Sequence, residues 1–186
     1  MMLMSSTLKR AVTAFVVTLM FVTSSYADDE ELTALFEGLR GEDPTAAAQI
    51  EGRIYDIWSQ SGSDSIDLLL DRGRKALAEE DAVQAIEHLT ALIDHAPDFA
   101  EGYNARATAF FQSGKYGLAL ADIQKTLALN PRHFDAMSGL ALILEELGHL
   151  EDALAAWREV EALHPHRDGL KDAVARLERQ VEGADI

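Results

Sequence analysis

The chain contains no cysteine among its 186 residues. It therefore forms no disulfide, and neither a catalytic thiolate nor a cysteine-based metal site is available to it. Packing alone must hold the fold together. A chain of this size buries roughly 70% of the surface that its unfolded form exposes, which is enough for a continuous core without covalent cross-links.

Basic residues are also scarce, because 16 lysines and arginines stand against 32 aspartates and glutamates, giving a formal net charge of −16. Clusters of lysine and arginine that neutralise phosphates supply most of a protein's affinity for nucleic acid, and this sequence has no such cluster. We therefore predict no binding to nucleic acid or to anionic membrane surfaces. The excess acid is typical of a solvated helical surface, and it would also attract a basic partner.

The signatures of common catalytic sites are missing as well. No serine lies in a nucleophile elbow, and no glycine-rich loop is suited to holding a phosphate. Acidic pairs such as Glu145 and Glu146 are adjacent in sequence, and adjacent residues on a helix point about 100° apart, so they cannot flank one substrate bond. We predict that the protein is not an enzyme and uses no cofactor.

What the chain does contain is an internal repeat. Three of its four prolines, Pro97, Pro131 and Pro165, are spaced 34 residues apart. Twelve residues before each proline stands an alanine, followed four positions later by a bulky apolar residue; the pairs are Ala85 with Leu89, Ala119 with Ile123, and Ala153 with Trp157. Further upstream a large residue is followed by a small one; the pairs are Leu69 with Gly73, Tyr103 with Ala107, and Met137 with Ala141. A fixed period with matching side chains predicts stacked helical hairpins.

This pattern resembles the tetratricopeptide repeat family, whose 34-residue helix-turn-helix units stack into a superhelix with a concave groove. The resemblance covers residues 66–165 and implies an all-α solenoid, to which we add helical caps at both ends. The three implied repeats are 66–99, 100–133 and 134–165.

Two arginines depart from the family pattern. Arg72 and Arg106 occupy a position where the family prefers leucine, which Leu140 keeps in the third repeat. Arginine can pack its stem on apolar surface and extend its charged group to water, so we expect both side chains to point outward. In the second and third repeats, Gly114 and Gly148 suit a helix-ending turn.

The first 27 residues have the layout of an export signal. Lys9 and Arg10 precede an apolar run over 11–22, and small residues precede a cleavage site after Ala27. The run is shorter than the roughly 20 residues that a membrane span needs. We predict a cleaved signal peptide at 1–27 and a location in the bacterial periplasm, with an uncleaved membrane anchor as the alternative. Cleavage removes two basic residues and no acidic one, so the net charge becomes −18.

Between the signal and the repeats, residues 28–65 contain two apolar stripes at helical spacing. The first is Leu32, Leu35, Phe36 and Leu39, and the second is Ile50, Ile54, Ile57 and Trp58. Asp43 before Pro44 predicts the start of the second helix, which should run to about Ser59. We expect this hairpin to cover the exposed apolar side of the first repeat, because the ends of a solenoid need caps. At the other end, residues 166–186 predict a C-terminal capping helix and tail.

Histidine offers an alternative function. His164 and His166 flank Pro165 and lie close in sequence to Asp168, so they are candidate ligands for zinc or copper in an exported metal-handling protein. No third ligand is evident, and we assign no metal site. The other histidines are expected at helix surfaces or helix ends; they are His88, His95, His133 and His149.

The resemblance implies that the first helix of each repeat lines the groove. The partner-binding residues that follow from it are Leu70, Arg74, Leu77, Asn104, Thr108, Phe111, Gln112, Ser138, Leu142 and Glu145. The same helices would bring six acids to the groove against Arg74 as the one base; the acids are Asp67, Asp71, Glu101, Asp135, Glu145 and Glu146. Some family members bind a chaperone's C-terminal carboxylate through lysine, asparagine and arginine. That clamp is missing here, because the corresponding positions hold Leu70, Arg74, Ala105, Asp135 and Gly139.

Such a groove suits an extended or helical segment of another protein that carries apolar anchors and some basic residues. We therefore expect a non-catalytic adaptor or scaffold of the periplasm or cell envelope that captures a partner protein reversibly. The alternatives are the metal-handling protein and an accessory subunit of an envelope enzyme complex. The fold cannot decide between them, because repeat scaffolds carry many unrelated functions.

Overall fold

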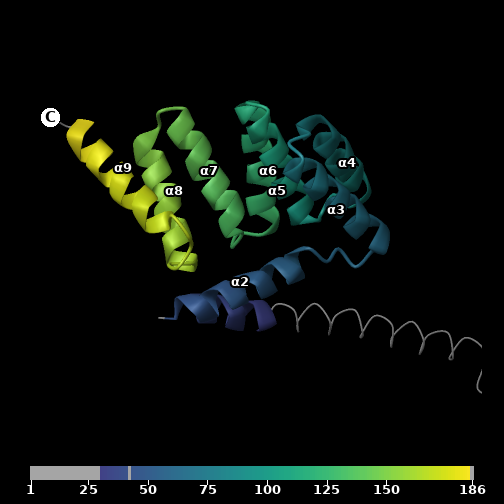
Figure 1. The fold of residues 1–186 in the computed structure, drawn as a ribbon, viewed down its shortest axis with the longest axis horizontal. Coiled ribbons are helices and arrows are strands. Elements are labelled where there is room, and N and C mark those ends of the chain that lie inside the picture. Colours follow the sequence, from purple (N-terminus) through teal and green to yellow (C-terminus); the bar gives the residue numbers. More distant parts are fainter. Residues whose placement is uncertain (1–29, 42, 185–186) are drawn as a thin grey trace, which may run out of the picture.

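The computed structural model describes residues 30–41 and 43–184, and the expected signal peptide at 1–27 lies outside these residues. In the described part, every regular element is an α-helix, which confirms the predicted all-α class. The helices form a curved row of antiparallel hairpins, with the N-terminal helices running beneath it (Figure 1).

The helix boundaries follow the repeat period. The first described helix covers residues 30–39. The others are α2 (Pro44–Trp58), α3 (Asp64–Ala78), α4 (Ala82–His95), α5 (Ala100–Gln112), α6 (Tyr116–Leu129), α7 (Phe134–Glu146), α8 (Leu150–Leu163) and α9 (Leu170–Ala184). Helices α5 and α7 begin 34 residues apart, as do α6 and α8. Each of the pairs α3 with α4, α5 with α6 and α7 with α8 is one hairpin.

Small residues stand where two helices of a hairpin approach closely. Ala85, Ala119 and Ala153 are fully buried in the second helices of the three hairpins. A side chain at Gly73 in α3 would place its Cβ 2.5 Å from Cγ of Leu89 in α4, so only glycine fits there without displacement. The small residue of the first helix thus faces the large residue of the second, which is how the repeated pattern brings the two helices together.

The turn inside each hairpin requires left-handed backbone. Gly114 and Gly148 adopt φ values of 68° and 78° between the two helices of the second and third hairpins. Glycine adopts this conformation without steric cost, which explains its position at the helix end. In the first hairpin Glu80 has a φ of 59°, and it is the one non-glycine residue with positive φ in the described part of the chain.

Helix α2 begins as the sequence predicts. Asp43 accepts a hydrogen bond from the backbone N–H of Thr45 at 2.9 Å, and Pro44 occupies the first helical position. The helix ends at Trp58, and Ser59 follows it as the C-cap.

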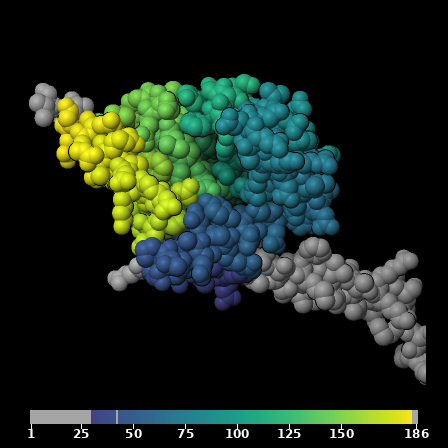
Figure 2. Space-filling view, viewed as in Figure 1, coloured from purple at the N-terminus to yellow at the C-terminus, as the bar shows by residue number. Residues whose placement is uncertain are grey.

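The N-terminal hairpin, residues 30–41 and 43–58, does not cover the first repeat, and this expectation was wrong. Its buried residues share one core with the third repeat and α9; the members are Phe36, Leu39, Ala47, Ile54, Trp58, Phe134, Ala141, Ala153, Leu154, Trp157, Val160, Leu170, Val174 and Leu177. The physical reason is the aromatic residue Phe134 at the start of α7, whose fully buried ring packs against the rings of the hairpin. The ring centroids of Trp58 and Phe134 are 4.9 Å apart, and those of Tyr55 and Phe134 are 5.8 Å apart. Figure 2 shows the hairpin lying along one edge of the row and contacting its C-terminal end.

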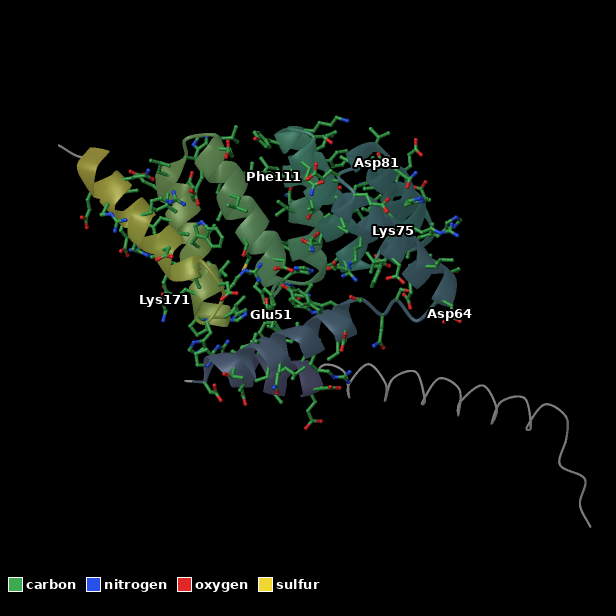
Figure 3. All side chains as sticks on the ribbon, in the orientation of Figure 1. Glu51, Asp64, Lys75, Asp81, Phe111 and Lys171 are labelled. Atoms are coloured by element: carbon green, nitrogen blue, oxygen red, sulfur yellow. The ribbon has the colours of Figure 1, made fainter. Side chains whose placement is uncertain are left out.

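The first repeat does without an apolar cover because the outer face of α3 is largely charged. Asp71, Arg72, Lys75 and Glu79 are exposed and recur at helical spacing. Figure 3 shows Lys75 at the end of the row that lies away from the third repeat. A terminal repeat with a polar outer face meets water directly, and Arg72 points to solvent as expected.

Arg106 does not extend to water, which corrects the second of the two arginine expectations. Its Nε and Nη2 atoms donate to the carboxylate of Asp122 at 2.7 and 2.8 Å, and Nη1 donates to the Thr90 hydroxyl at 3.1 Å. A buried carboxylate placed opposite the guanidinium holds it between the helices. Arg106 therefore ties α4, α5 and α6 together.

The placement of the hairpin predicts energetic coupling between distant residues. In a double-mutant cycle, Trp58→Phe and Phe134→Leu should show a coupling of about 0.5–1.5 kcal/mol, because their rings are in contact. Trp58→Phe combined with Leu89→Val, in the core of the first repeat, should be additive within about 0.5 kcal/mol. Urea unfolding followed by circular dichroism measures both cycles. If Trp58 were coupled to Leu89 and not to Phe134, the hairpin would have to pack on the first repeat, and the placement described above would be wrong.

Candidate functional site

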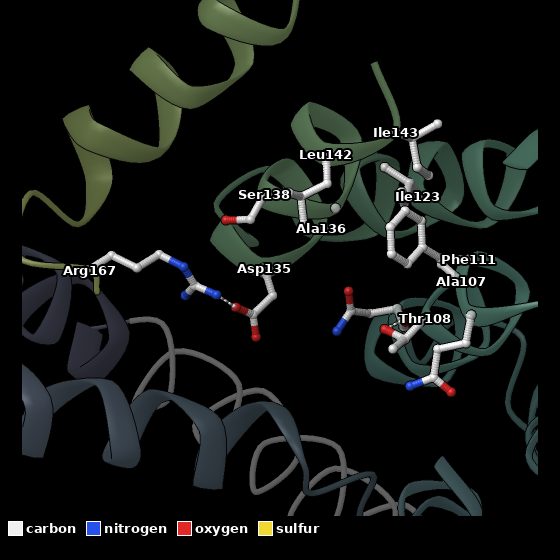
Figure 4. A pocket seen from close by; sticks show the side chains of 13 residues that line it. Ala107, Thr108, Phe111, Ile123, Asp135, Ala136, Ser138, Leu142, Ile143 and Arg167 are labelled. Carbon is white, nitrogen blue, oxygen red and sulfur yellow. Dashed lines mark hydrogen bonds and ion pairs between the residues drawn. The ribbon is translucent and has the colours of Figure 1, made fainter. Parts of the chain in front are cut away.

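A pocket of about 390 Å³ lies in the groove between α5 and α7 (Figure 4). Its apolar lining consists of Ala107, Phe111, Ile123, Ala136, Gly139, Leu142 and Ile143. Its polar lining consists of Asn104, Thr108, Gln112, Asp135, Ser138 and Arg167. The volume falls in the range of ligand-binding pockets, roughly 300–1,000 Å³. Alanine and glycine on the facing helices leave this space unfilled.

Six of the ten groove residues named from the sequence line this pocket. They are Asn104, Thr108, Phe111, Gln112, Ser138 and Leu142. The structure brings them together because α5 and α7 are equivalent helices of neighbouring repeats. Whether they contact a partner stays a prediction.

The other four groove residues lie elsewhere, and the structure gives a reason for each. Leu70 is 1% exposed in the core of the first repeat, and Leu77 packs against the same core. Arg74 is engaged by Glu101 at 2.8 Å. Glu145 accepts a hydrogen bond from Trp157 Nε1 at 2.7 Å and forms an ion pair with Arg176 at 2.7 Å, so it faces α8 and α9.

Arg167 is a pocket residue that the sequence analysis missed. It comes from the loop between α8 and α9, and its Nη2 lies 2.5 Å from Oδ1 of Asp135 (Figure 4). The repeat period gives no signal for it, because the loop residue reaches the groove only through the fold of the third repeat.

The groove is less acidic than its sequence suggests. Glu101 pairs with Arg74, Asp135 with Arg167, and Glu145 with Arg176. Asp67 accepts two hydrogen bonds from Ser61. Half of the six acids are therefore compensated by a cation of the protein itself.

A buried polar network crosses the three repeats beside the pocket. The sequence predicts His133 at a helix surface or a helix end, and it is the N-cap of α7. It is nevertheless fully buried, and its ring stacks on Trp58 with centroids 4.2 Å apart. Its Nδ1 accepts from the N–H of Ala136, so Nε2 carries the proton and donates to Glu101 at 2.9 Å. Burial alone would raise the pKa of Glu101, but His133 and Arg74 lower it below its usual value. The carboxylate is therefore ionised and fully paired.

A second network joins the hairpin to the pocket. The hydroxyl of Tyr55 lies 3.0 Å from carboxylate oxygens of both Glu51 and Asp135, and Arg167 lies 3.3 Å from Glu51. Burial and the charge of Asp135 raise the pKa of Tyr55, so its hydroxyl stays protonated and can donate. Hairpin residues thus position the Asp135–Arg167 pair at the edge of the pocket.

The two histidines proposed for metal binding lie near different parts of the hairpin, and neither ring nitrogen of His164 has a hydrogen-bond partner among the described residues. His164 is buried with its Nε2 atom 3.4 Å from Glu51, and it packs edge-on against Phe134. His166 hydrogen-bonds to the backbone carbonyl of Gly41. Across 30–41 and 43–184, no three histidine, aspartate or glutamate side chains converge in a way that could hold a metal ion.

The sequence profile of the tetratricopeptide repeat matches residues 70–121 and 104–168, which together span more than half of the chain. The chain belongs to the tetratricopeptide repeat family. A repeat-containing protein of this family from Rhizobium etli is 35% identical over 161 residues, covering 86% of this chain and 79% of the relative.

Solved tetratricopeptide domains share the fold. The first such domain of Spaghetti (RPAP3), bound to the HSP90 peptide SRMEEVD, superposes with a TM-score of 0.62 at 23% identity over 64% of this chain and 98% of that one. The TPR2B domain of yeast Sti1, in a complex with pHsp70, gives a TM-score of 0.58 at 20% identity over 63% of this chain and 99% of that one. At these identities the likeness shows the fold alone. Among the described helices of this tetratricopeptide protein, none has the length and apolar character needed to cross a bilayer.

The burial of His164 predicts that acid destabilises the fold. Burial lowers the pKa of His164 from its usual 6.5, while Glu51 opposes the shift and Arg167 and His166 add to it. As pH falls below about 6.5, the unfolded chain binds a proton at this ring that the folded chain does not, so stability decreases. The free energy of unfolding in urea should be lower at pH 5.5 than at pH 7.5. The difference between the two pH values should shrink in His164→Gln, and an equal difference in both proteins would contradict the assignment.

Proposed function

We propose that this protein is a non-catalytic adaptor that captures a segment of another protein in the pocket between α5 and α7. The observation that carries the proposal is the pocket itself, in which an apolar floor meets four neutral polar side chains. These are Asn104, Thr108, Gln112 and Ser138. Peptide segments are recognised by pockets that take apolar anchors and by polar groups that bond to the peptide backbone.

The structural relatives support a peptide as the ligand. The Spaghetti domain holds an HSP90 peptide and the Sti1 domain is in a complex with pHsp70. This chain lacks the carboxylate clamp expected of such domains, because Leu70 and Ala105 are buried and Arg74 is bound to Glu101. The proposed ligand is therefore an internal segment with a bulky apolar residue, and not a chain end held by its terminal carboxylate.

Flanking charge supports a basic character for the partner. Glu146 ends α7, one of the two helices beside the pocket, and it is exposed without an ion-pair partner among the described residues. The chain as a whole carries a formal charge of −16, which attracts basic partners and repels acidic ones. We propose that basic residues flank the apolar anchor.

We also propose that the protein is exported to the periplasm and acts there. Support comes from the N-terminal layout of Lys9, Arg10, an apolar run and a small residue at Ala27. The absence of cysteine is compatible with an oxidising compartment, because no thiol is present to be oxidised.

Filling the pocket should abolish capture of the partner. Thr108 is exposed on α5 and lines the pocket, so Thr108→Trp places a large ring in the space without disturbing the core. Ala121→Trp, at an exposed site on α6 outside the pocket, is the matched control. The chain lacking residues 1–27 serves as bait in an envelope extract. Proteins retained by the original chain and the control should bind Thr108→Trp at least about tenfold more weakly, a loss of roughly 1.4 kcal/mol. Equal capture by all three baits would reject the pocket.

Export predicts a defined mature chain. Expression of the full sequence in a Gram-negative bacterium should yield a periplasmic protein whose intact mass corresponds to residues 28–186, beginning at Asp28. Ala27→Arg should block cleavage, because the site requires a small residue. Recovery of the uncleaved chain from the cytoplasm would contradict the proposal.

A further inference from the structure

The buried side chains divide the described part of the chain into two halves. In the first half, the core of α3, α4 and α5 includes Leu70, Leu89 and Leu92, and Arg106 attaches α6 to it. In the second half, the hairpin, α7, α8 and α9 share the core that contains Phe134. These two cores have no buried residue in common.

The joint between the halves has a smaller fully buried core than either half. Its buried members are three alanines and two isoleucines, namely Ala107, Ala119, Ile123, Ala136 and Ile143. The larger apolar side chains packed against them are only partly buried; they are Phe110, Phe111, Tyr116, Leu120, Leu127 and Leu140. Alanine buries little apolar surface, so this joint has less fully buried apolar surface to hold it together than either half has. The pocket lies at this joint, and it shares four of the joint's buried residues.

A second connection spans the two halves. The hairpin belongs to the core of the second half, yet the chain continues from Trp58 directly into α3 of the first half. The intervening linker, residues 59–63, is anchored on α3. The backbone N–H and hydroxyl of Ser61 donate to Asp67 at 2.9 and 2.5 Å, and Arg74 donates to the Ser59 hydroxyl at 2.9 Å.

The polar network follows the same route. Arg74 of the first half binds Glu101, which accepts from His133, and the ring of His133 stacks on Trp58 of the hairpin. The hairpin also reaches the end of the third repeat, where Arg40 donates to the carbonyl of Ala162 at 3.2 Å. The two halves are therefore connected by the covalent chain, by hydrogen bonds and by ring stacking, all on the side where the hairpin lies.

We propose that the hairpin and its linker, residues 30–41 and 43–63, form an internal strap that holds the two halves at a fixed separation and so sets the width of the pocket. A linker of five residues spans at most about 18 Å, at about 3.6 Å for each residue, so it limits how far the ends of α2 and α3 can separate. The strap restrains opening at the joint, where the buried core is smallest. This role does not depend on what the pocket binds.

Lengthening the linker tests the strap while keeping every contact of the hairpin with the third repeat. Insertion of Gly-Ser-Gly-Ser after Gly62 adds slack at little cost in loop entropy. Because the chain has no cysteine, Ala121→Cys and Ala155→Cys place nitroxide labels only at these exposed sites on α6 and α8, one in each half. Pulsed electron paramagnetic resonance then measures the distance between the labels, with circular dichroism as a check on folding.

We expect the insertion to broaden the distance distribution and to move its mean by about 2 Å or more, the scale of a hinge rearrangement. A second label pair, Ala155→Cys with Lys171→Cys, lies within one half and should not change. Ser59→Ala with Ser61→Ala, which frees the linker from α3 without lengthening it, should give a smaller change in the same direction. Unchanged distributions for the first label pair in both the insertion and the serine variant would overturn the strap.

Discussion

The packing of hairpin rings around Phe134 decides the arrangement of the whole molecule. Phe134 begins α7, and the rings of Trp58, Tyr55 and His164 approach it within 6 Å between centroids. Aromatic side chains bury about 150–250 Å² each, so this cluster is a large part of the driving force that binds the hairpin to the third repeat. A hairpin bound there cannot also cover the first repeat. The outer face of α3 is largely charged, so the first repeat can be exposed to water without a cap.

The acidic residues buried beside these rings are paired with cations, and this makes the groove less acidic. Glu101 is 6% exposed, and a carboxylate removed from water to that degree requires partners, which Arg74 and His133 provide. Asp135 obtains its partner from Arg167 in the same way. Acids that look in the sequence like a binding surface for a basic ligand are thus used to hold α3, α5, α7 and the hairpin together. What remains for a ligand is an apolar floor with neutral polar walls.

The sequence predicts what depends on local period and misses what depends on long-range contact. Small and large residues at fixed offsets predict the helices and turns, since Gly73 must face Leu89 wherever that hairpin forms. Leu70, Asn104 and Ser138 are equivalent under a shift of 34 residues, yet only the last two line the pocket, because Leu70 is drawn into the first core. The hairpin's position, the Arg106–Asp122 pair and Arg167 in the pocket each join residues that no period relates.

The pocket and the small buried core of the joint are both caused by small side chains in the second and third repeats. Alanine and glycine at the facing positions of α5 and α7 leave the space that forms the pocket, and the same small residues give the joint a smaller buried core than either half has. Larger residues there would strengthen the joint and remove the pocket. A restraint from outside the joint keeps both the space and a defined geometry. The N-terminal hairpin is placed to supply it, which gives a physical reason for its position beside the last repeat.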